Sequence, residues 1–359
     1  MVMVYKNHGI RVMLSLILLS ALLLTSVLFA GCGSASDNRK KNNLRIGVSV
    51  YDGYDTFISD MTQDMNEWAR EKEKETGSAI LLDIVSAGGS QLTQNDQIAR
   101  FIDKGYDAVC VNPVDRTDTT AIIDKAKSAN VPVVFFNREP VAEDLNRFDK
   151  LFYVGANAEQ SGALQASLVI NALSDPARFA QIDKSGDGVI QYVILEGEIG
   201  HQDALIRTQV SIETIQQAGY SIEKIGDEIA NWNRNQANSK MSMLLDTYPT
   251  QIEMVIANDD DMALGALDAV EHKGADLPLI VGINGVDEAL EMVKMKKMEG
   301  TVYNDAKGQA AKIMELAFDL SEPDGPTAVF SADGGSRVFY VDYRLIDYHN
   351  VQDFIRLKE

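Results

Sequence analysis

From Leu44 onward, hydrophobic and polar residues follow a repeating strand–helix pattern. Short apolar runs rich in β-branched residues predict strands, and longer segments with apolar residues three or four positions apart predict helices. In the first half the predicted strands are 44–51, 79–86, 107–112, 132–136 and 151–155, and the predicted helices are 57–74, 91–104 and 117–129.

The same pattern repeats after residue 157. Predicted helices cover 157–173, 202–218, 233–246, 260–273, 285–296 and 305–321, predicted strands cover 189–195, 222–229, 252–257, 278–283 and 299–303, and short strand-like pieces run from 337 to 346. Repeated βα units indicate parallel sheets with helices on both faces. Two halves of similar size in 359 residues therefore predict an α/β protein with two doubly wound domains.

A different segment precedes this pattern. Lys6 and Arg11 form a short basic region, and an almost continuous apolar run follows them. This arrangement is typical of a secretory signal peptide, here residues 1–31. Small residues directly before Cys32 resemble a bacterial lipobox, which predicts acylation of Cys32, a polar lipidated tether over 32–43 and an extracytoplasmic protein held at the cell membrane by its lipid. An uncleaved signal anchor is the alternative.

The charge and the cysteine content of the chain exclude some kinds of partner and an intramolecular disulfide. The formal net charge is −20, and removal of Lys6 and Arg11 with the signal peptide brings it to −22. Such an acidic surface argues against nucleic acid and anionic membranes as partners, because phosphate contacts need Lys and Arg. With Cys32 acylated, Cys110 is the only thiol left, so we expect no intramolecular disulfide and a buried Cys110 in its strand.

Candidate binding residues follow the predicted strands. Ligands of doubly wound sheets lie beyond the carboxyl ends of the strands, which places the site in the cleft between the two domains. The residues at these positions are Asp55, Phe57, Asn137, His201, Asp203, Arg207, Trp232, Asp259, Asp260, Asn284 and Asn304. Asp, Asn, Arg and His suit sugar hydroxyls, and the aromatic rings suit the apolar face of a sugar. Each residue alone is better explained as a helix cap or core residue, so the interpretation rests on the whole set.

Catalytic interpretations have weaker support. The sequence contains no Gly-x-Ser-x-Gly elbow and no Gly-rich nucleotide-binding motif. His201 and Asp203 are two positions apart, so they would not form a dyad on one helix face. We therefore expect a binding protein and no catalytic residues, and a secreted glycosidase remains an alternative.

Residues 183–191 match the first part of an EF-hand calcium loop. The loop offers oxygens at positions 1, 3, 5, 7 and 9 of that pattern, from Asp183, Ser185, Asp187, the Val189 carbonyl and Gln191. Position 12, which needs a bidentate Glu, is Ile194. Because calcium takes six to eight oxygens, either the loop binds nothing or a carboxylate from elsewhere completes it.

Several ordered segments resemble the bacterial periplasmic galactose/glucose-binding proteins, the substrate-binding components of galactoside ABC transporters. The resemblance covers roughly 44–321, with a weaker tail. It is carried by segments such as Arg-Ile-Gly-Val-Ser-Val-Tyr (45–51), Val-Pro-Val-Val-Phe-Phe-Asn-Arg-Glu-Pro (131–140), Asp-Gly-Val-Ile-Gln (187–191), Gly-His-Gln-Asp-Ala (200–204), Val-Ile-Ala-Asn-Asp-Asp (255–260) and Gly-Thr-Val-Tyr-Asn-Asp-Ala (300–306).

The resemblance implies the type I periplasmic-binding-protein fold, with two doubly wound parallel-sheet domains joined by a three-segment hinge. One lobe would comprise 44–156 plus 304–339, and the other 157–303 plus 340–359, with crossovers near 155–157, 303–305 and 338–342. It further implies a monomer that binds galactose or glucose with high affinity and delivers it to an ABC permease by hinge closure.

The resemblance also assigns roles to individual residues. Phe57 and Trp232 would sandwich the sugar ring, Asp55 would meet the hydroxyl that separates galactose from glucose, and Asp203 and Arg207 would hold the anomeric end. Asn137, His201 and Asn304 match further sugar contacts, whereas Asp259 and Asn284 exchange the family's Asn and Asp. The calcium loop would be completed by Glu253.

Two other functions share this fold. A lipoprotein of this type could present its sugar to a membrane receptor or histidine kinase and act as a sensor. A related repressor would need a DNA-binding helix-turn-helix before the core, where this chain has its predicted signal peptide and tether. The sequence leaves the preferred hexose open.

Overall fold

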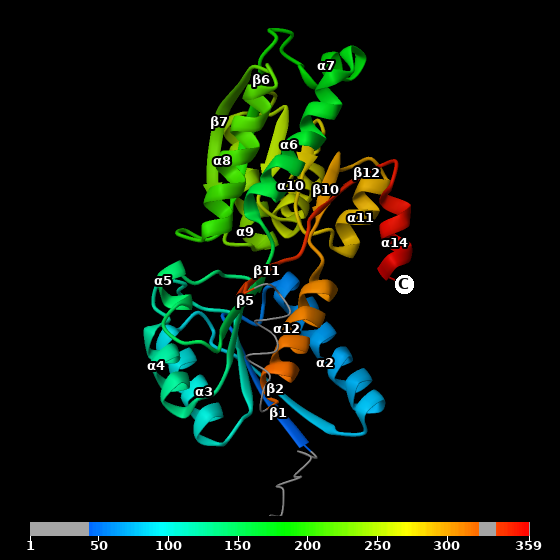
Figure 1. The fold of residues 1–359 in the computed structure, drawn as a ribbon. Coiled ribbons are helices and arrows are strands. Elements are labelled where there is room, and N and C mark those ends of the chain that lie inside the picture. The colour runs from blue at the N-terminus through cyan, green and yellow to red at the C-terminus, as the bar shows by residue number, and fades with distance from the viewer. Residues whose placement is uncertain (1–42, 323–334, 359) are drawn as a thin grey trace, which may run out of the picture. The chain divides into compact units, whose positions relative to one another are not determined.

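The computed structural model describes residues 43–322 and 335–358, and these described residues belong to one compact unit. Within it lie two six-stranded sheets, each covered by helices (Figure 1). The predicted signal peptide (1–31), Cys32 and almost all of the predicted tether lie outside the described residues. Among the described residues, none of the helices combines the length and apolar character that a membrane span requires.

The first sheet has the strand order β11-β5-β4-β3-β1-β2, and all its neighbouring strands are parallel. We call this sheet and its helices the N-terminal lobe. Its strands are β1 (Asn43–Val50), β2 (Ala79–Ser86), β3 (Ala108–Val111), β4 (Val133–Phe136), β5 (Leu151–Gly155) and β11 (Val338–Tyr340). Its helices are α2 (Thr56–Thr76), α3 (Gln91–Asp103), α4 (Thr120–Ala129), α5 (Ala142–Leu145) and α12 (Ala306–Leu320).

The second sheet has the order β12-β10-β9-β8-β6-β7, with β12 antiparallel to β10 and the other pairs parallel. We call this sheet and its helices the C-terminal lobe. Its strands are β6 (Ile190–Glu196), β7 (Ile222–Ile229), β8 (Met254–Ala257), β9 (Leu279–Val281), β10 (Gly300–Tyr303) and β12 (Arg344–Asp347). Its helices are α6 (Ala158–Ser174), α7 (Pro176–Ile182), α8 (Gln202–Gln217), α9 (Arg234–Thr247), α10 (Asp260–Lys273), α11 (Asp287–Lys294) and α14 (Val351–Lys358).

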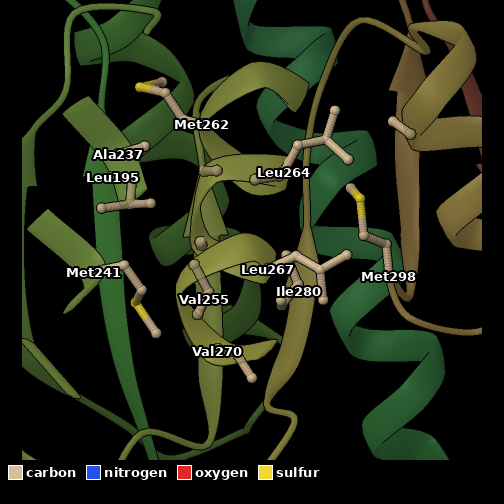
Figure 2. Packing of buried hydrophobic residues seen from close by; sticks show 14 of the residues in the cluster. Leu195, Ala237, Met241, Val255, Met262, Leu264, Leu267, Val270, Ile280 and Met298 are labelled. Carbon is tan, nitrogen blue, oxygen red and sulfur yellow. The ribbon is translucent and has the colours of Figure 1, made fainter. Parts of the chain in front are cut away.

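The central strands are apolar throughout because both faces of each sheet are covered. β3, β4 and β8 are buried at every position. On one face of the second sheet, Val255 and Ile280 of the strands pack with Met241 of α9 and Leu267 of α10 (Figure 2). Cys110 in β3 is fully buried, as expected, and burial raises its pKa to about 12.

The chain passes three times between the sheets, after β5, after β10 and between β11 and β12. Helix α12 returns to the first sheet and packs against α2. Two largely parallel sheets with helices on both faces confirm the predicted fold class. Among the helices of residues 43–322 and 335–358, three were not predicted from the sequence: α5, α7 and α14.

Candidate functional site

Ten side chains from both lobes line one pocket at the carboxyl ends of the strands. They are ten of the eleven residues that follow the predicted strands: Asp55, Phe57, Asn137, His201, Asp203, Arg207, Trp232, Asp259, Asn284 and Asn304. The eleventh, Asp260, does not line this pocket; its carboxylate accepts the N–H groups of Gly285 and Val286. Asn137 comes directly after β4, and Asn304 directly after β10. Parallel strands end at the same edge of a sheet, which is why residues so far apart in sequence meet here.

Asp55 is fixed from two sides. As the N-cap of α2, it accepts the Ile58 N–H through Oδ1 at 3.0 Å, and its Oδ2 accepts the Tyr51 hydroxyl at 2.7 Å. Burial and the Asp55 charge raise the pKa of Tyr51, so this hydroxyl remains a donor. The carboxylate keeps further lone pairs for a ligand, and Phe57 lies buried in the first turn of the same helix.

Asn137 has a left-handed backbone, with φ 59°, a conformation that Asn adopts more readily than most residues. Its Oδ1 accepts the Asn112 amide at 3.0 Å, and its backbone carbonyl accepts the Tyr153 hydroxyl at 2.8 Å. With Oδ1 engaged in this way, the Asn137 amide is presented as a donor.

His201 is held in one tautomer. It is the N-cap of α8, and its Nδ1 accepts the Asp203 N–H at 3.2 Å, so in the neutral ring the proton is on Nε2. Burial, with the positive charges of Arg138 and Arg207, lowers the pKa of His201 well below its usual value. At neutral pH the ring is therefore uncharged and offers an Nε2–H donor.

Arg207 is a buried cation with three neighbours. Nη1 donates to the Asn258 carbonyl and Nη2 to the Tyr343 hydroxyl, each at 2.9 Å, and Asp203 lies 3.5 Å from Nη2. Its Nε has no hydrogen-bond partner among the described residues. A buried donor without a partner is costly, so a ligand acceptor at this place would be strongly favoured.

Trp232 depends on a glycine across from it. Its backbone is left-handed, with φ 57°, and its ring meets His201 edge to face, with 5.0 Å between centroids. A Cβ at Gly197 would lie 2.0 Å from the indole ring. Only glycine at position 197 therefore leaves room for this placement of Trp232.

Asp259 caps a helix and carries a buried charge. Its Oδ1 accepts the Met262 N–H at 2.8 Å at the start of α10. Burial, and next the negative charge of Asp261, raise the pKa of Asp259 well above its usual value. Asp259 has no ion pair among the described residues, so its charge depends on donors from helix and ligand.

Asn284 and Asn304 are oriented by a short chain of amides. Gln309 Nε2 donates to Asn304 Oδ1 at 2.6 Å, and Asn304 Nδ2 donates to Asn284 Oδ1 at 3.3 Å. Asn284 Oδ1 is thereby used, which leaves the Asn284 amide as the donor. The pocket therefore has an acceptor at 259 and a donor at 284.

The residues that orient these side chains were not found from the sequence. They are Tyr51, Asn112, Asn258, Gln309 and Tyr343, and all of them lie outside the predicted contact set. Asn258 carried one available signal, because it precedes Asp259 in the same polar run after a strand. Tyr343 carried none, because its role depends on the last passage of the chain between the sheets.

The predicted calcium loop lies between α7 and β6, and Glu253 is folded against it. Glu253 is 1% exposed, and its two carboxylate oxygens accept the N–H groups of Ser185 and Gln191, each at 3.0 Å. Asp183 accepts the N–H groups of Gly186 and Gly188 at 2.7 and 3.0 Å. Within the described chain these carboxylates do not form a preassembled metal cluster.

The chain is similar to known proteins over most of its length. The family model described as "Periplasmic binding protein domain" matches residues 46–325. A D-galactose/methyl-galactoside binding periplasmic protein of Haemophilus influenzae is 34% identical over 336 residues, which cover 93% of this chain and 98% of that protein. A xylitol-binding protein of Mycolicibacterium smegmatis is 29% identical, with 75% and 70% covered.

Among solved structures, an ABC transporter solute binding protein from Bacillus halodurans with bound myo-inositol has a TM-score of 0.71 and 27% sequence identity. The alignment covers 87% of this chain and 97% of that one.

Proposed function

Because the chain belongs to the periplasmic binding protein family, we propose that its pocket binds galactose or glucose outside the cytoplasm and delivers it to an ABC permease. One observation carries this proposal. A single pocket unites three carboxylates, three carboxamides, an imidazole and a guanidinium with two aromatic side chains. Sugar hydroxyls donate and accept, so their recognition requires donors and acceptors in fixed positions.

The two aromatic residues come from different lobes, Phe57 from α2 and Trp232 from the turn after β7. A pyranose ring has an apolar face that packs on an indole or phenyl ring. Closing the lobes would bring both aromatic rings onto the sugar, and the polar residues would meet its hydroxyls. Hinge closure of this kind gives a permease a distinct bound form to recognise.

The relatives favour a neutral polyol. Their printed names and bound ligand are D-galactose or methyl-galactoside, xylitol and myo-inositol. The choice of galactose or glucose rests on the relative with the highest identity of the three and on Asp55, the residue proposed to meet the epimeric hydroxyl. Because the family consists of solute-binding proteins, we propose binding without turnover.

We further propose that the loop at 183–191 binds Ca²⁺ together with Glu253. The donor set suits calcium, because carboxylates, an amide oxygen, a hydroxyl and a carbonyl are all hard oxygen ligands. Glu253 is buried, and no Lys or Arg of the described chain pairs with it. A bound cation would neutralise this charge and those of Asp183 and Asp187. Gln191 Nε2 now donates to Asp187 at 3.3 Å, and the opposite amide orientation would present its oxygen.

The attachment of the protein to the membrane is inferred from the sequence alone. We propose that Cys32 carries lipid, that the monomer touches the membrane only through this anchor, and that residues 33–43 separate the anchor from the fold. Globomycin, which inhibits cleavage of lipoprotein precursors, should cause an unprocessed form to accumulate, and Cys32→Ala should release the protein from the membrane. A Cys32→Ala protein that stays at the membrane would contradict the anchor.

Isothermal titration with a panel of monosaccharides tests the proposed function. We expect saturable binding of galactose or glucose, and loss of affinity by several-fold or more in Trp232→Ala. The matched control is Tyr348→Ala, a half-exposed aromatic outside the pocket. The proposal fails when no hexose binds, and the sandwich assignment fails when Trp232→Ala binds as tightly as the wild type.

A further inference from the structure

Arg138 is a buried cation directly after pocket residue Asn137, and it contacts both lobes. Its side chain is 6% exposed. Within the N-terminal lobe, Nη1 donates to the Val114 carbonyl at 2.8 Å, and the guanidinium carbon lies 3.6 Å from the centroid of the Tyr51 ring. Toward the C-terminal lobe, Nη2 donates to Glu198 Oε2 at 2.6 Å.

Within the N-terminal lobe, Arg138 contacts Tyr51, and Tyr51 in turn contacts pocket residue Asp55. The Tyr51 ring carries the guanidinium on its face, and its hydroxyl donates to Asp55 Oδ2 at 2.7 Å. Stacking on a buried ring restricts the ring's position, and the ring position fixes where the hydroxyl meets the carboxylate. Arg138 is thus connected to Asp55 through Tyr51, although Arg138 does not itself line this pocket.

Within the C-terminal lobe, Glu198 contacts pocket residue His201 through its backbone. Glu198 lies in the loop between β6 and α8, and its backbone carbonyl accepts the His201 N–H at 3.0 Å. The carboxylate of Glu198 is the exposed partner of the pair, at 43%. It can return to water when the lobes separate, whereas Arg138 keeps its contacts with Val114 and Tyr51.

We propose that Arg138 and Glu198 form a latch that holds the lobes closed over the sugar, and that Arg138 is a positioning residue that fixes Asp55 through Tyr51. The proposal rests on the proposed function, because it names the residues that keep that binding pocket closed. Arginine suits this role because its planar guanidinium can stack on the ring and at the same time donate to a carbonyl and a carboxylate.

The latch is tested by stopped-flow measurement of sugar binding and release, followed by Trp fluorescence. Removing the latch should increase the dissociation rate about three- to tenfold in Glu198→Gln and in Arg138→Gln, and change the association rate by less than about twofold. The double variant should dissociate no faster than Arg138→Gln alone, because the two residues act as a pair. The matched control is Glu299→Gln, which removes the Arg178–Glu299 pair at 2.8 Å, outside the pocket lining.

The positioning role needs a second readout, the ratio of galactose to glucose affinity. Tyr51→Phe keeps the ring but loses the hydroxyl to Asp55, and it should change this ratio. Arg138→Gln should change it in the same direction, and Arg138→Lys should recover part of the wild-type ratio. Glu198→Gln should leave the ratio within about twofold, because Glu198 makes no hydrogen bond to Tyr51 or Asp55 and reaches them only through Arg138.

Additive effects of Arg138→Gln and Glu198→Gln on the dissociation rate would overturn the latch. An unchanged affinity ratio in Arg138→Gln would overturn the positioning role. When the wild type binds no monosaccharide, the proposed function itself fails, and the latch is then judged by small-angle X-ray scattering. Equal radii of gyration for the wild type and both single variants would overturn it.

Discussion

Nη2 of Arg207 donates a 2.9 Å hydrogen bond to the hydroxyl of Tyr343, and both side chains are buried. Tyr343 lies between β11 and β12, where the chain makes its last passage between the sheets. Its own N–H donates to Gln160 Oε1 at 3.0 Å. The C-terminal segment thus supports a side chain that lines the pocket.

Tyr343→Phe should therefore reduce both stability and affinity. The substitution removes the hydroxyl that accepts from Nη2 and leaves this buried donor with only the longer, 3.5 Å contact to Asp203, at a cost of about 1–3 kcal/mol in the free energy of unfolding. A less constrained Arg207 should also bind hexose more weakly. Urea denaturation and calorimetric titration measure the two effects, with exposed Tyr348→Phe as the control. Wild-type values in Tyr343→Phe would show that Arg207 is held by its other neighbours.

His201 should make the folded protein less stable as the pH falls. Its folded-state pKa is lowered by burial and by Arg138 and Arg207, whereas the unfolded chain has an ordinary histidine pKa of about 6.5. Below that pH the unfolded chain binds a proton at His201 that the folded state does not bind. The contribution of His201 to the free energy of unfolding is therefore complete above about pH 6.5 and is lost as the pH falls. Hexose binding should continue as the pH falls through the ordinary histidine pKa, because the lowered pKa keeps the Nε2–H donor neutral there.

His201→Gln should remove this dependence. The difference in melting temperature between wild type and variant is measured from pH 8 to pH 5, with the exposed His272→Gln as the control. As the pH falls, the melting temperature of the wild type should decrease more than that of His201→Gln. A difference that is constant over this range would mean that His201 is protonated in the folded state as easily as in the unfolded chain.

Asp259→Asn should stabilise the ligand-free protein while weakening sugar binding. Burial raises the pKa of Asp259, so the folded state favours its protonated form, and stability is lost as the pH rises above the unfolded value of about 3.9. Asn keeps the helix cap without the buried charge. At pH 7 the variant should have the larger free energy of unfolding but should lack an acceptor for a sugar hydroxyl.

The double variant Asp259→Asn/Asn284→Asp restores one acceptor and one donor in exchanged places, so it should recover part of the lost affinity. Exposed Asp276→Asn is the control. An Asp259→Asn protein that binds hexose like the wild type would show that the exchange of donor and acceptor has no effect on recognition. Calorimetric titration with galactose and glucose, together with urea denaturation at pH 7, measures both effects.

The pattern of apolar positions was sufficient for the sheets, because central strands such as β4 and β8 are buried on both faces and appear as continuous apolar runs. It was insufficient for short helices. α7 begins at Pro176 after its N-cap Asp175, and this pair is a helix-start signal that the apolar pattern does not include. α14 has apolar residues at 351, 354 and 355, which is helical spacing.

For the site, the sequence likewise predicted which residues line the pocket but not how their side chains are oriented. The rule that ligands lie beyond strand ends gave the ten pocket residues, because that position depends only on where a strand stops. It also gave Asp260, whose carboxylate accepts backbone N–H groups within its own lobe and does not line the pocket. The tautomer of His201 and the amide orientation of Asn284 could not be predicted. Each depends on a particular hydrogen bond, from Asp203 N–H and from Asn304, and only folded coordinates give those geometries.

Calcium should raise the melting temperature of metal-stripped protein through Glu253. A ligand that binds only the folded state stabilises it by about 2.7 kcal/mol at a concentration one hundred times its dissociation constant. Glu253→Gln retains the shape of the side chain but removes a buried charge, so it should lose most of this calcium-dependent shift. Exposed Glu223→Gln should keep it. Differential scanning calorimetry with and without calcium makes the measurement. A wild-type protein that does not respond to calcium, or a Glu253→Gln protein that responds equally, would exclude a calcium site built on this carboxylate.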